Sequence, residues 1–320
     1  MKLKMLYSFL NADLQIIEKE LEATIQANSP VLREASMHLL QAGGKRIRPV
    51  FVLLASKFGT HDIHVTKNVA VALELIHMAS LVHDDVIDDA ELRRGAPTIK
   101  SKWDNRVAMY TGDYIFARSL ELMANIDNSV AHQILSNTIV EVCIGEIEQI
   151  KDKFNFEQNI KTYFRRIKRK TALLIATSCQ LGAVASGVSE DIHKKLFLFG
   201  YYVGMSYQIT DDILDFTASE KDLGKPAGSD LLQGNITLPV LYAMEHDSNK
   251  EILESINENS TQEDIARAIS VIKSSGAIER SIAVSDLYLK KALFILRQLP
   301  ENKAKKTFME IAKNIGKRKF

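Results

Sequence analysis

The stretch Leu81-Val82-His83-Asp84-Asp85-Val86-Ile87-Asp88-Asp89-Ala90 places a cluster of aspartates within an apolar, helix-forming sequence. Residues four apart lie on one face of a helix, so Asp84 and Asp88 should stack one turn apart, with Asp85 beside them. Carboxylates this close repel each other, and hard oxygen ligands of this kind suit a divalent cation such as Mg²⁺. The alternative is a solvated acidic helix end, and the rest of the chain has to decide between them.

A second stretch, Ser206-Tyr207-Gln208-Ile209-Thr210-Asp211-Asp212-Ile213-Leu214-Asp215-Phe216, repeats the same aspartate spacing. Asp211 and Asp215 should share a face of another largely apolar helix. Burying two such clusters without a cation would cost several kcal/mol per ion, which argues against two unrelated solvated helix ends. Mg²⁺ takes few protein carboxylates and completes its shell with substrate phosphates. Two clusters facing each other across a helical bundle therefore indicate a phosphorylated or diphosphate substrate.

The periodicity of apolar residues is helical nearly throughout, and no window shows sustained strand alternation. With 320 residues, 46% hydrophobic and 25% charged, the composition is that of a soluble globular protein. A net charge of +1 argues against a strongly basic nucleic-acid-binding protein. We predict one all-α domain spanning residues 1–320. The expected helices are an opening amphipathic helix ending before Asn28, then 31–42, 49–58, 65–89, 99–110, 112–125, 129–152, 157–186, 190–217, 237–246, 262–274, 277–297 and 301–316, with Ser260 and Glu263 at the spacing of a capping box.

The cysteines and the N-terminus favour a cytoplasmic location. Cys143 and Cys179 have neither a disulfide framework nor metal-ligand spacing, and both sit among apolar residues. We expect buried free thiols in a reducing compartment. The N-terminus lacks the apolar run of a signal peptide. The uncharged stretch from Thr171 to Ser189 is too polar for a transmembrane segment, so we predict a buried helix there.

Basic residues flank the first acidic cluster. Gly43-Gly44-Lys45-Arg46-Ile47-Arg48-Pro49 joins a turn to a helix N-terminus, where free N–H groups and the dipole favour anions. His77 lies seven residues before Asp84 on the same helical face, although a lone helical histidine is commonly structural. Arg93 and Arg94 follow the cluster and suit bidentate phosphate contacts, with simple charge balance as the alternative.

Further basic residues precede and follow the second cluster. The run from Lys161 to Lys170 is expected to be mostly solvated, except for Lys170 and Thr171 at the border with the uncharged segment. Lys225 lies in a loop after the second cluster, a candidate lid. The C-terminal Lys317-Arg318-Lys319 is predicted to be a disordered tail, with a phosphate contact as the alternative.

The chain resembles the trans-polyprenyl diphosphate synthases. The motifs that carry the resemblance, in family order, are GGKRIRP at 43–49, LVHDDVIDDAELRRGAPT at 81–98, GDYIFARS at 112–119, the pair Lys170-Thr171, YQITDDILDF at 207–216 and GKPAGSDLLQGNITLP at 224–239. The resemblance implies an all-α helical bundle of the isoprenoid synthase type with a central cavity. It also implies that several Mg²⁺ ions bridge the diphosphate of an allylic substrate, which isopentenyl diphosphate then attacks.

The resemblance also implies a role for each candidate residue. The main metal ligands would be Asp84, Asp88 and Asp211, supported by Asp85, Asp212 and Asp215. The residues that hold the allylic diphosphate would be Arg93, Lys170 and Lys225, with Thr171 and Gln208 directing dipoles at the developing carbocation. The residues that hold isopentenyl diphosphate would be Lys45, Arg48, His77 and Arg94.

Within this family the chain is most similar to the catalytic components of bacterial two-component synthases that make heptaprenyl diphosphate for menaquinone side chains. This implies farnesyl diphosphate as the primer and, as partners, a smaller regulatory subunit, a homodimer or both. The net charge and the polarity of the uncharged stretch predict neither a nucleic-acid partner nor a transmembrane segment. The small residues Ala79 and Ser80, about one turn before Asp84, predict a long product tunnel beneath the first cluster. The alternatives are another chain length from hexaprenyl to nonaprenyl, a terpene cyclase, or a non-catalytic partner subunit; the intact aspartate clusters argue against the last.

Overall fold

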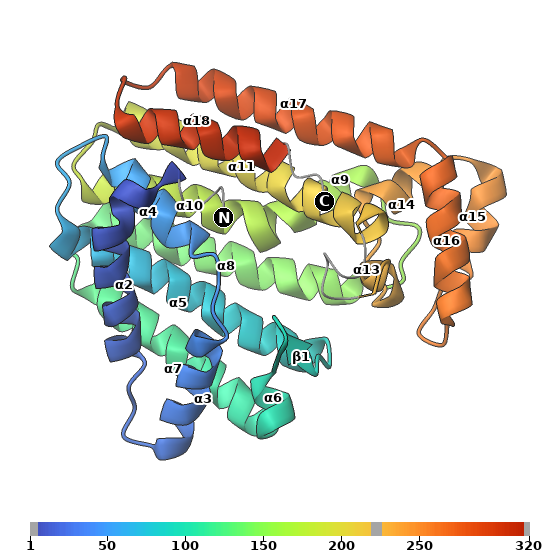
Figure 1. Ribbon diagram of the computed structural model, residues 1–320, viewed down its shortest axis with the longest axis horizontal. Coiled ribbons are helices and arrows are strands. Elements are labelled where there is room, and N and C mark those ends of the chain that lie inside the picture. The colour runs from blue at the N-terminus through green and yellow to red at the C-terminus, as the bar shows by residue number, and fades with distance from the viewer. Residues whose placement is uncertain (1–5, 219–225, 317–320) are drawn as a thin grey trace. The chain divides into compact units, whose positions relative to one another are not determined.

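The computed structural model describes residues 6–218 and 226–316, and Figure 1 shows that these residues are almost entirely helical. The prediction of an all-α protein is therefore confirmed. The chain divides into two compact units. The first comprises Met1–Leu135, Thr177–Leu196 and Pro300–Thr307, and the second comprises Ser136–Ala176, Phe197–Leu299 and Phe308–Phe320. That the whole chain forms one domain stays a prediction.

The first unit is built around α5 (Ile63–Ile87), which packs along α7 and α4. Its length and apolar composition would suit a membrane span, but 67% of its most apolar window is buried, as in the core helix of a folded domain. The part of the chain that the structure describes contains no second helix of this kind. The other elements assigned mainly to this unit are the 3₁₀-helix η1 (Ser8–Leu10), α2 (Asn11–Thr24), α3 (Pro30–Gln41), α4 (Ile47–Ser56), β1 (Leu92–Arg93), β2 (Ala96–Pro97), α6 (Ile99–Lys102), α7 (Asn105–Ala124) and α10 (Leu173–Ala185).

The helix break predicted at residue 111 is wrong. Helix α7 runs through Gly112, and the real break lies earlier, at Asp104, whose side chain accepts a hydrogen bond from the Val107 amide at 2.8 Å and caps α7. A Cβ at Gly112 would overlap the His83 ring. The glycine therefore marks close packing of α7 against α5 rather than the end of a helix.

The second unit places α11 beside α17, and the side chains of Ser206 and Ser285 meet at 2.7 Å between their hydroxyl oxygens. Figure 1 shows the two helices running alongside each other. The elements assigned mainly to this unit are α8 (Ser129–Lys151), α9 (Ile160–Ile167), the π-helix η2 (Lys168–Ala172), α11 (Glu190–Thr217), α13 (Ser229–Leu232), α14 (Leu238–Ala243), α15 (Asp247–Glu254), α16 (Gln262–Ser274), α17 (Ala277–Arg297) and α18 (Lys303–Gly316).

Three sequence-based details of the second unit need correction. The helix expected over 157–186 is interrupted by the π-helix, which adds a residue to one turn. The capping box is formed by Thr261 and Asp264 and not by the predicted pair Ser260 and Glu263, because α16 starts at Gln262, one residue later than that pair requires. The basic run is mostly not solvated: only Lys161 and Arg165 are exposed, and Arg166 is buried.

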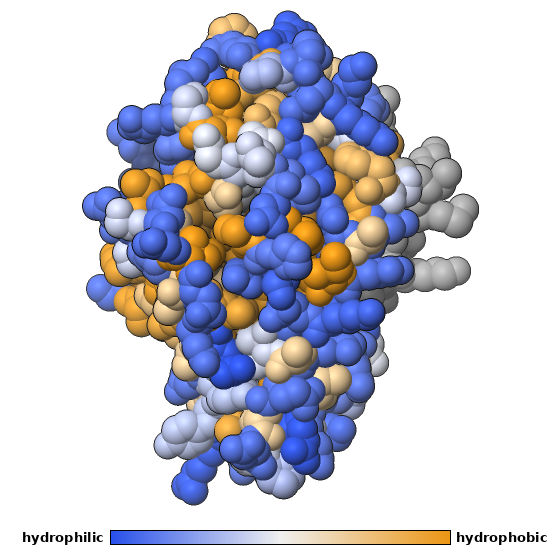
Figure 2. All heavy atoms as spheres, turned by 90° about the vertical axis from the view of Figure 1, so that its left-hand side faces the viewer, coloured by the Kyte–Doolittle hydropathy of each residue, from blue (hydrophilic) through white to orange (hydrophobic). Residues whose placement is uncertain are grey.

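The surface combines scattered apolar side chains with one ordered stripe. Figure 2 shows one face on which apolar patches are interrupted by polar side chains, as is normal for a protein surface. On α8, by contrast, Val140, Ile144, Ile147 and Ile150 are exposed at helical spacing, and we call these four residues the α8 stripe. Cys143 lies among them and is exposed, so the prediction that both cysteines are buried holds only for Cys179.

Candidate functional site

The first acidic cluster lies at the C-terminal end of α5, and its members differ in exposure. The Asp88 amide donates to the Asp84 carbonyl at 2.8 Å, so these two residues are one helical turn apart, as predicted. Both are half-buried, whereas Asp85 is only 3% exposed. Burial raises the pKa of Asp85, although Arg93 partly offsets this effect. Asp84 and Asp88 thus carry the more accessible carboxylates of this cluster.

Asp85 receives Arg93 from the hairpin that follows α5. Arg93 Nε and Nη2 both lie 2.7 Å from Asp85 Oδ1, an ion pair that fixes the guanidinium beside the cluster. The charge-balance interpretation of Arg93 is therefore correct as far as Asp85 is concerned. Arginine has further N–H groups in the same plane, so this pairing is compatible with the predicted contact to a diphosphate.

The hairpin β1–β2 places the two arginines differently, with Arg93 in strand β1 and Arg94 in the turn. Arg94 and Gly95 form its turn, with φ angles of 55° and 80°, a conformation typical of two-residue hairpin loops. The hairpin is anchored on both sides, because Thr98 Oγ1 donates to the Ala90 carbonyl at 2.8 Å and His38 Nε2 lies 2.7 Å from the Pro97 carbonyl. Arg94 therefore lies on a turn that is anchored on both sides and not on a flexible loop.

Arg94 lies within reach of the Gly43–Pro49 segment and His77. A Cβ at Gly44 would lie 2.8 Å from Arg94 Nη1. Burial lowers the pKa of His77 well below its ordinary value, and the charges of Arg48, Arg94 and other arginines lower it further. The structure thus brings together three of the four residues predicted to bind isopentenyl diphosphate. The fourth, Lys45, is exposed on the adjoining loop.

Because folding lowers the pKa of His77, acid should destabilise the protein through this residue. Below the unfolded-state pKa of about 6.5, the unfolded chain binds a proton that folded His77 refuses, so stability is lost as the pH falls. One such group changes the free energy of unfolding by at most about 1.4 kcal/mol per pH unit. We expect His77→Gln to reduce the slope of unfolding free energy against pH, measured by urea denaturation between neutral pH and about pH 5.5. His64→Gln, at an exposed position on the same helix, is the matched control, and equal slopes in all three proteins would contradict the assignment.

The two residues predicted to set product length lie one turn before the cluster. Ala79 is 2% exposed, and Ser80 is half-buried with its hydroxyl donating to the His77 carbonyl at 2.9 Å. His77, Ser80 and Asp84 follow one another at three- and four-residue steps, and all three are partly exposed on a helix that is otherwise mostly buried. This face of α5 is therefore more open than the rest of the helix, whereas Ala79 lies off it.

The second acidic cluster shows the same division between accessible and buried carboxylates. Asp211 is exposed, whereas Asp212 is 3% exposed and both of its oxygens are engaged. Tyr163 donates its hydroxyl to Asp212 Oδ2 at 2.6 Å, and Gln208 Nε2 donates to Oδ1 at 2.8 Å. Burial and then the nearby charge of Asp230 raise the pKa of Asp212 to about 8, against the opposing effect of these two donors.

Asp215 holds the segment that begins after residue 225. Its side chain accepts from the Ser229 hydroxyl at 3.0 Å and from the Asp230 amide at 3.1 Å, and its carbonyl accepts from the Gly228 amide at 2.8 Å. Asp215 is 1% exposed. The carboxylate therefore caps α13, and its predicted support of a metal ion stays a prediction. Lys225 and Lys317-Arg318-Lys319 lie outside the described residues.

The π-helix carries Lys170 and Thr171. The Leu173 amide donates to the Lys168 carbonyl, five residues back, and this wider turn shifts the register of the helix at the predicted site residues. Thr171 Oγ1 donates to Gln208 Oε1 at 2.6 Å, and Lys170 Nζ lies 3.7 Å from Glu146. The predicted pair Thr171 and Gln208 is thus in direct contact.

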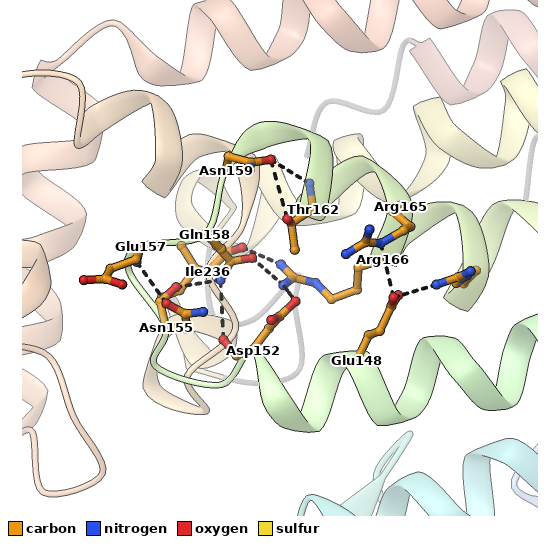
Figure 3. A network of polar contacts seen from close by, with 11 residues as sticks. Glu148, Asp152, Asn155, Glu157, Gln158, Asn159, Thr162, Arg165, Arg166 and Ile236 are labelled. Atoms are coloured by element: carbon orange, nitrogen blue, oxygen red, sulfur yellow. Dashed lines mark hydrogen bonds and ion pairs between the residues drawn. The ribbon is translucent and has the colours of Figure 1, made fainter.

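Sequence reasoning missed Tyr163 and Arg166, which adjoin the second cluster. Arg166 is 6% exposed and donates to Gln158 Oε1 at 2.7 Å and to the Ile236 carbonyl (Figure 3). In the sequence, Arg166 is one member of a basic run and Tyr163 is one aromatic residue of an amphipathic helix. Nothing in the sequence distinguishes either residue as part of a site.

The donor chemistry of both clusters fits Mg²⁺. The accessible carboxylates that we predict as ligands, those of Asp84, Asp88 and Asp211, offer only oxygen, which hard cations prefer. Within residues 6–218 and 226–316, no three acidic, histidine or cysteine side chains converge on a preformed cation site. A site that takes one or two carboxylates and leaves the rest of the shell to waters and substrate phosphates needs no such convergence.

Comparison with known proteins is consistent across sequence and structure. A model of the polyprenyl synthetase family matches residues 29–272. The chain is 66% identical to heptaprenyl diphosphate synthase component 2 of Bacillus subtilis over 320 residues, covering 100% of this chain and 92% of that protein. Heptaprenyl diphosphate synthase from Staphylococcus aureus superimposes with a TM-score of 0.93 and 46% identity, covering 97% of this chain and 98% of that one. A polyprenyl synthase from Caulobacter crescentus, complexed with calcium and isoprenyl diphosphate, superimposes with a TM-score of 0.93 and 31% identity over 99% of this chain and 98% of that one.

Proposed function

The chain belongs to the polyprenyl synthetase family, and from that premise we propose that it is a Mg²⁺-dependent trans-prenyltransferase that elongates farnesyl diphosphate to heptaprenyl diphosphate for menaquinone side chains. The observation that carries the chain length is the full-length similarity to heptaprenyl diphosphate synthase component 2. The division of each acidic cluster into accessible and buried carboxylates supports the chemistry, because it leaves oxygen ligands available while the buried members order neighbouring groups.

We assign the allylic diphosphate to the accessible carboxylates through Mg²⁺ and to the cations Arg93, Lys170 and Lys225. When bound, the ions supply Lewis-acid stabilisation of the departing diphosphate. Arg93 is held by Asp85, so its guanidinium is oriented before substrate arrives, which favours stabilisation of the leaving group. Support for a divalent cation comes from the donor set and from the related polyprenyl synthase complexed with calcium and isoprenyl diphosphate.

Isopentenyl diphosphate is assigned to Lys45, Arg48, His77 and Arg94. The lowered pKa of His77 keeps its imidazole neutral at neutral pH. The imidazole therefore adds no positive charge beside the arginines, which supply the charge that binds an anion. The double bond attacks the allylic cation, and we assign removal of the proton to the released diphosphate. Thr171 and Gln208 present oxygen atoms whose partial negative charge stabilises the cation while it exists.

A partner subunit is part of the proposal, because relatives such as the Bacillus subtilis protein are named component 2. The α8 stripe is an exposed apolar helix face of the kind that binds another protein. We propose that the occupant is the smaller component of a two-component synthase or, in its absence, a second copy of this chain. The cytoplasmic location is likewise proposed, on the support of the free thiols Cys143 and Cys179.

The test is incubation of the purified chain with Mg²⁺, farnesyl diphosphate and isopentenyl diphosphate, with and without the partner component, followed by sizing of the dephosphorylated products. We expect heptaprenol and a large gain from the partner. Ile147→Lys, at 58% exposure in the α8 stripe, should abolish that gain, whereas Leu287→Lys, at 50% exposure on α17, should not. A hydrocarbon formed without isopentenyl diphosphate would instead identify a terpene cyclase, and full activity of the chain alone would contradict the need for a partner.

A further inference from the structure

Three hydrogen bonds join a buried tyrosine to the residues assigned to the carbocation. Tyr163 donates to Asp212 Oδ2 at 2.6 Å, Gln208 Nε2 donates to Asp212 Oδ1 at 2.8 Å, and Thr171 donates to Gln208 Oε1 at 2.6 Å. All four residues belong to the second unit. Tyr163 is completely buried, so it is separated from any substrate and can act only through Asp212.

The relay fixes which end of the Gln208 amide faces Thr171. A phenol hydroxyl both donates and accepts, so Tyr163 can pair with Asp212 Oδ2 whether or not that oxygen carries a proton. In either state Oδ1 remains an acceptor and requires the NH₂ end of Gln208. The carbonyl end of the amide must then face Thr171, which places a negative dipole on the side assigned to the cation. Without the Tyr163 hydroxyl, Asp212 Oδ2 loses its 2.6 Å hydrogen bond, so the carboxylate can rotate and the Gln208 amide loses the partner that orients it.

Tyr163 packs against the buried Arg166, and Figure 3 shows the polar network that holds this arginine. The Arg166 guanidinium lies 5.8 Å from the centre of the Tyr163 ring and is anchored by Gln158, the Ile236 carbonyl and, at 3.7 Å, Asp152. A buried guanidinium with several fixed partners has little freedom to move. The network therefore fixes the position of the Tyr163 ring and directs its hydroxyl at Asp212.

We propose that Tyr163 is a positioning residue for prenyl transfer, which acts through Asp212 to hold the Gln208 carbonyl towards Thr171. This inference rests on the proposed function, since it assigns the relay to the carbocation step. Oriented dipoles of this kind act on the transition state and not on the bound substrates. The consequence is a specific kinetic signature.

The test is to measure the steady-state and single-turnover kinetics of Tyr163→Phe at a temperature well below the melting temperature of this variant. We expect kcat to fall about 10- to 100-fold, with the KM of each substrate within about threefold of the wild-type value. Tyr7→Phe, which removes a hydroxyl from a buried tyrosine of the first unit, should leave kcat unchanged. In a double-mutant cycle, Tyr163→Phe should add little to the loss already caused by Gln208→Leu, because Tyr163 acts on the cation only through Gln208.

Three outcomes separate the possibilities. A wild-type chain that does not extend farnesyl diphosphate with its partner would overturn the proposed function, whatever the variants do. An active wild type with unchanged kcat in Tyr163→Phe, or with losses that multiply in the double variant, would overturn the positioning role alone. If Tyr163→Phe does not fold, Asp212→Leu removes both acceptors of the relay at similar volume: a lower kcat at an unchanged Mg²⁺ requirement supports positioning, whereas an unchanged kcat or a raised Mg²⁺ requirement overturns it.

Discussion

Replacing Asp84 with asparagine should lower kcat by about 1,000-fold or more while leaving the fold intact. Asparagine keeps the size of the side chain but removes the negative charge, so the affinity of the site for a divalent cation falls and the leaving diphosphate loses its main stabilisation. Asp84 lies half-buried in the last turn of α5, one turn before Asp88. The substitution removes the repulsion between these two carboxylates, so we expect the stability of the protein to rise rather than fall. Steady-state kinetics over a range of Mg²⁺ concentrations, together with a thermal melt, measure both effects.

The matched control is Asp89→Asn in the same acidic stretch. Asp89 is 89% exposed, pairs with Lys100, and has a left-handed φ of 52° that asparagine tolerates. We expect its activity to stay within about threefold of the wild-type value, as for most surface changes. Equal activity of the two variants, or a loss in Asp84→Asn that more Mg²⁺ does not alter, would remove Asp84 from the set of main ligands.

The helical fold, and the residues that gather around the first acidic cluster, were predictable because they depend on local spacing. Helical periodicity is a property of neighbouring residues, and it placed α5 and the pair Asp84 and Asp88 correctly. His77 and Arg94 were also predicted, and the structure brings them together with Arg48. These residues either share the face of one helix or lie next to a turn whose glycines are visible in the sequence.

The remaining features depend on contacts between distant segments, which spacing does not encode. The helix break predicted at residue 111 is wrong because nothing in the sequence shows that His83 packs closely against Gly112. The π-helix at Lys168–Ala172 has no apolar periodicity of its own. Tyr163 and Asp212 are 49 residues apart, so their hydrogen bond is visible only in the folded chain. That the two acidic clusters face each other stays a prediction of the proposed function.

Replacing Ala79 with phenylalanine should shorten the product from heptaprenyl towards geranylgeranyl length. Ala79 is 2% exposed and lies about one turn before Asp84, so a larger side chain there must displace its neighbours or fill open space below the cluster. If that space is the product tunnel, the aromatic ring blocks it and elongation stops early, while chemistry at the aspartates continues. Sizing the dephosphorylated products by chromatography, at equal total turnover, measures the change.

Overpacking is the competing explanation, and the same helix offers a control for it. Forcing a large side chain into a filled core costs about 1–3 kcal/mol. Ala70 is fully buried on α5 and lies nine residues before Ala79, two and a half turns away and hence on the opposite face. Ala70→Phe should therefore lower stability by a similar amount without changing product length. A shortened product in both variants would indicate a general distortion of α5, and an unchanged product in a folded Ala79→Phe would place the tunnel elsewhere.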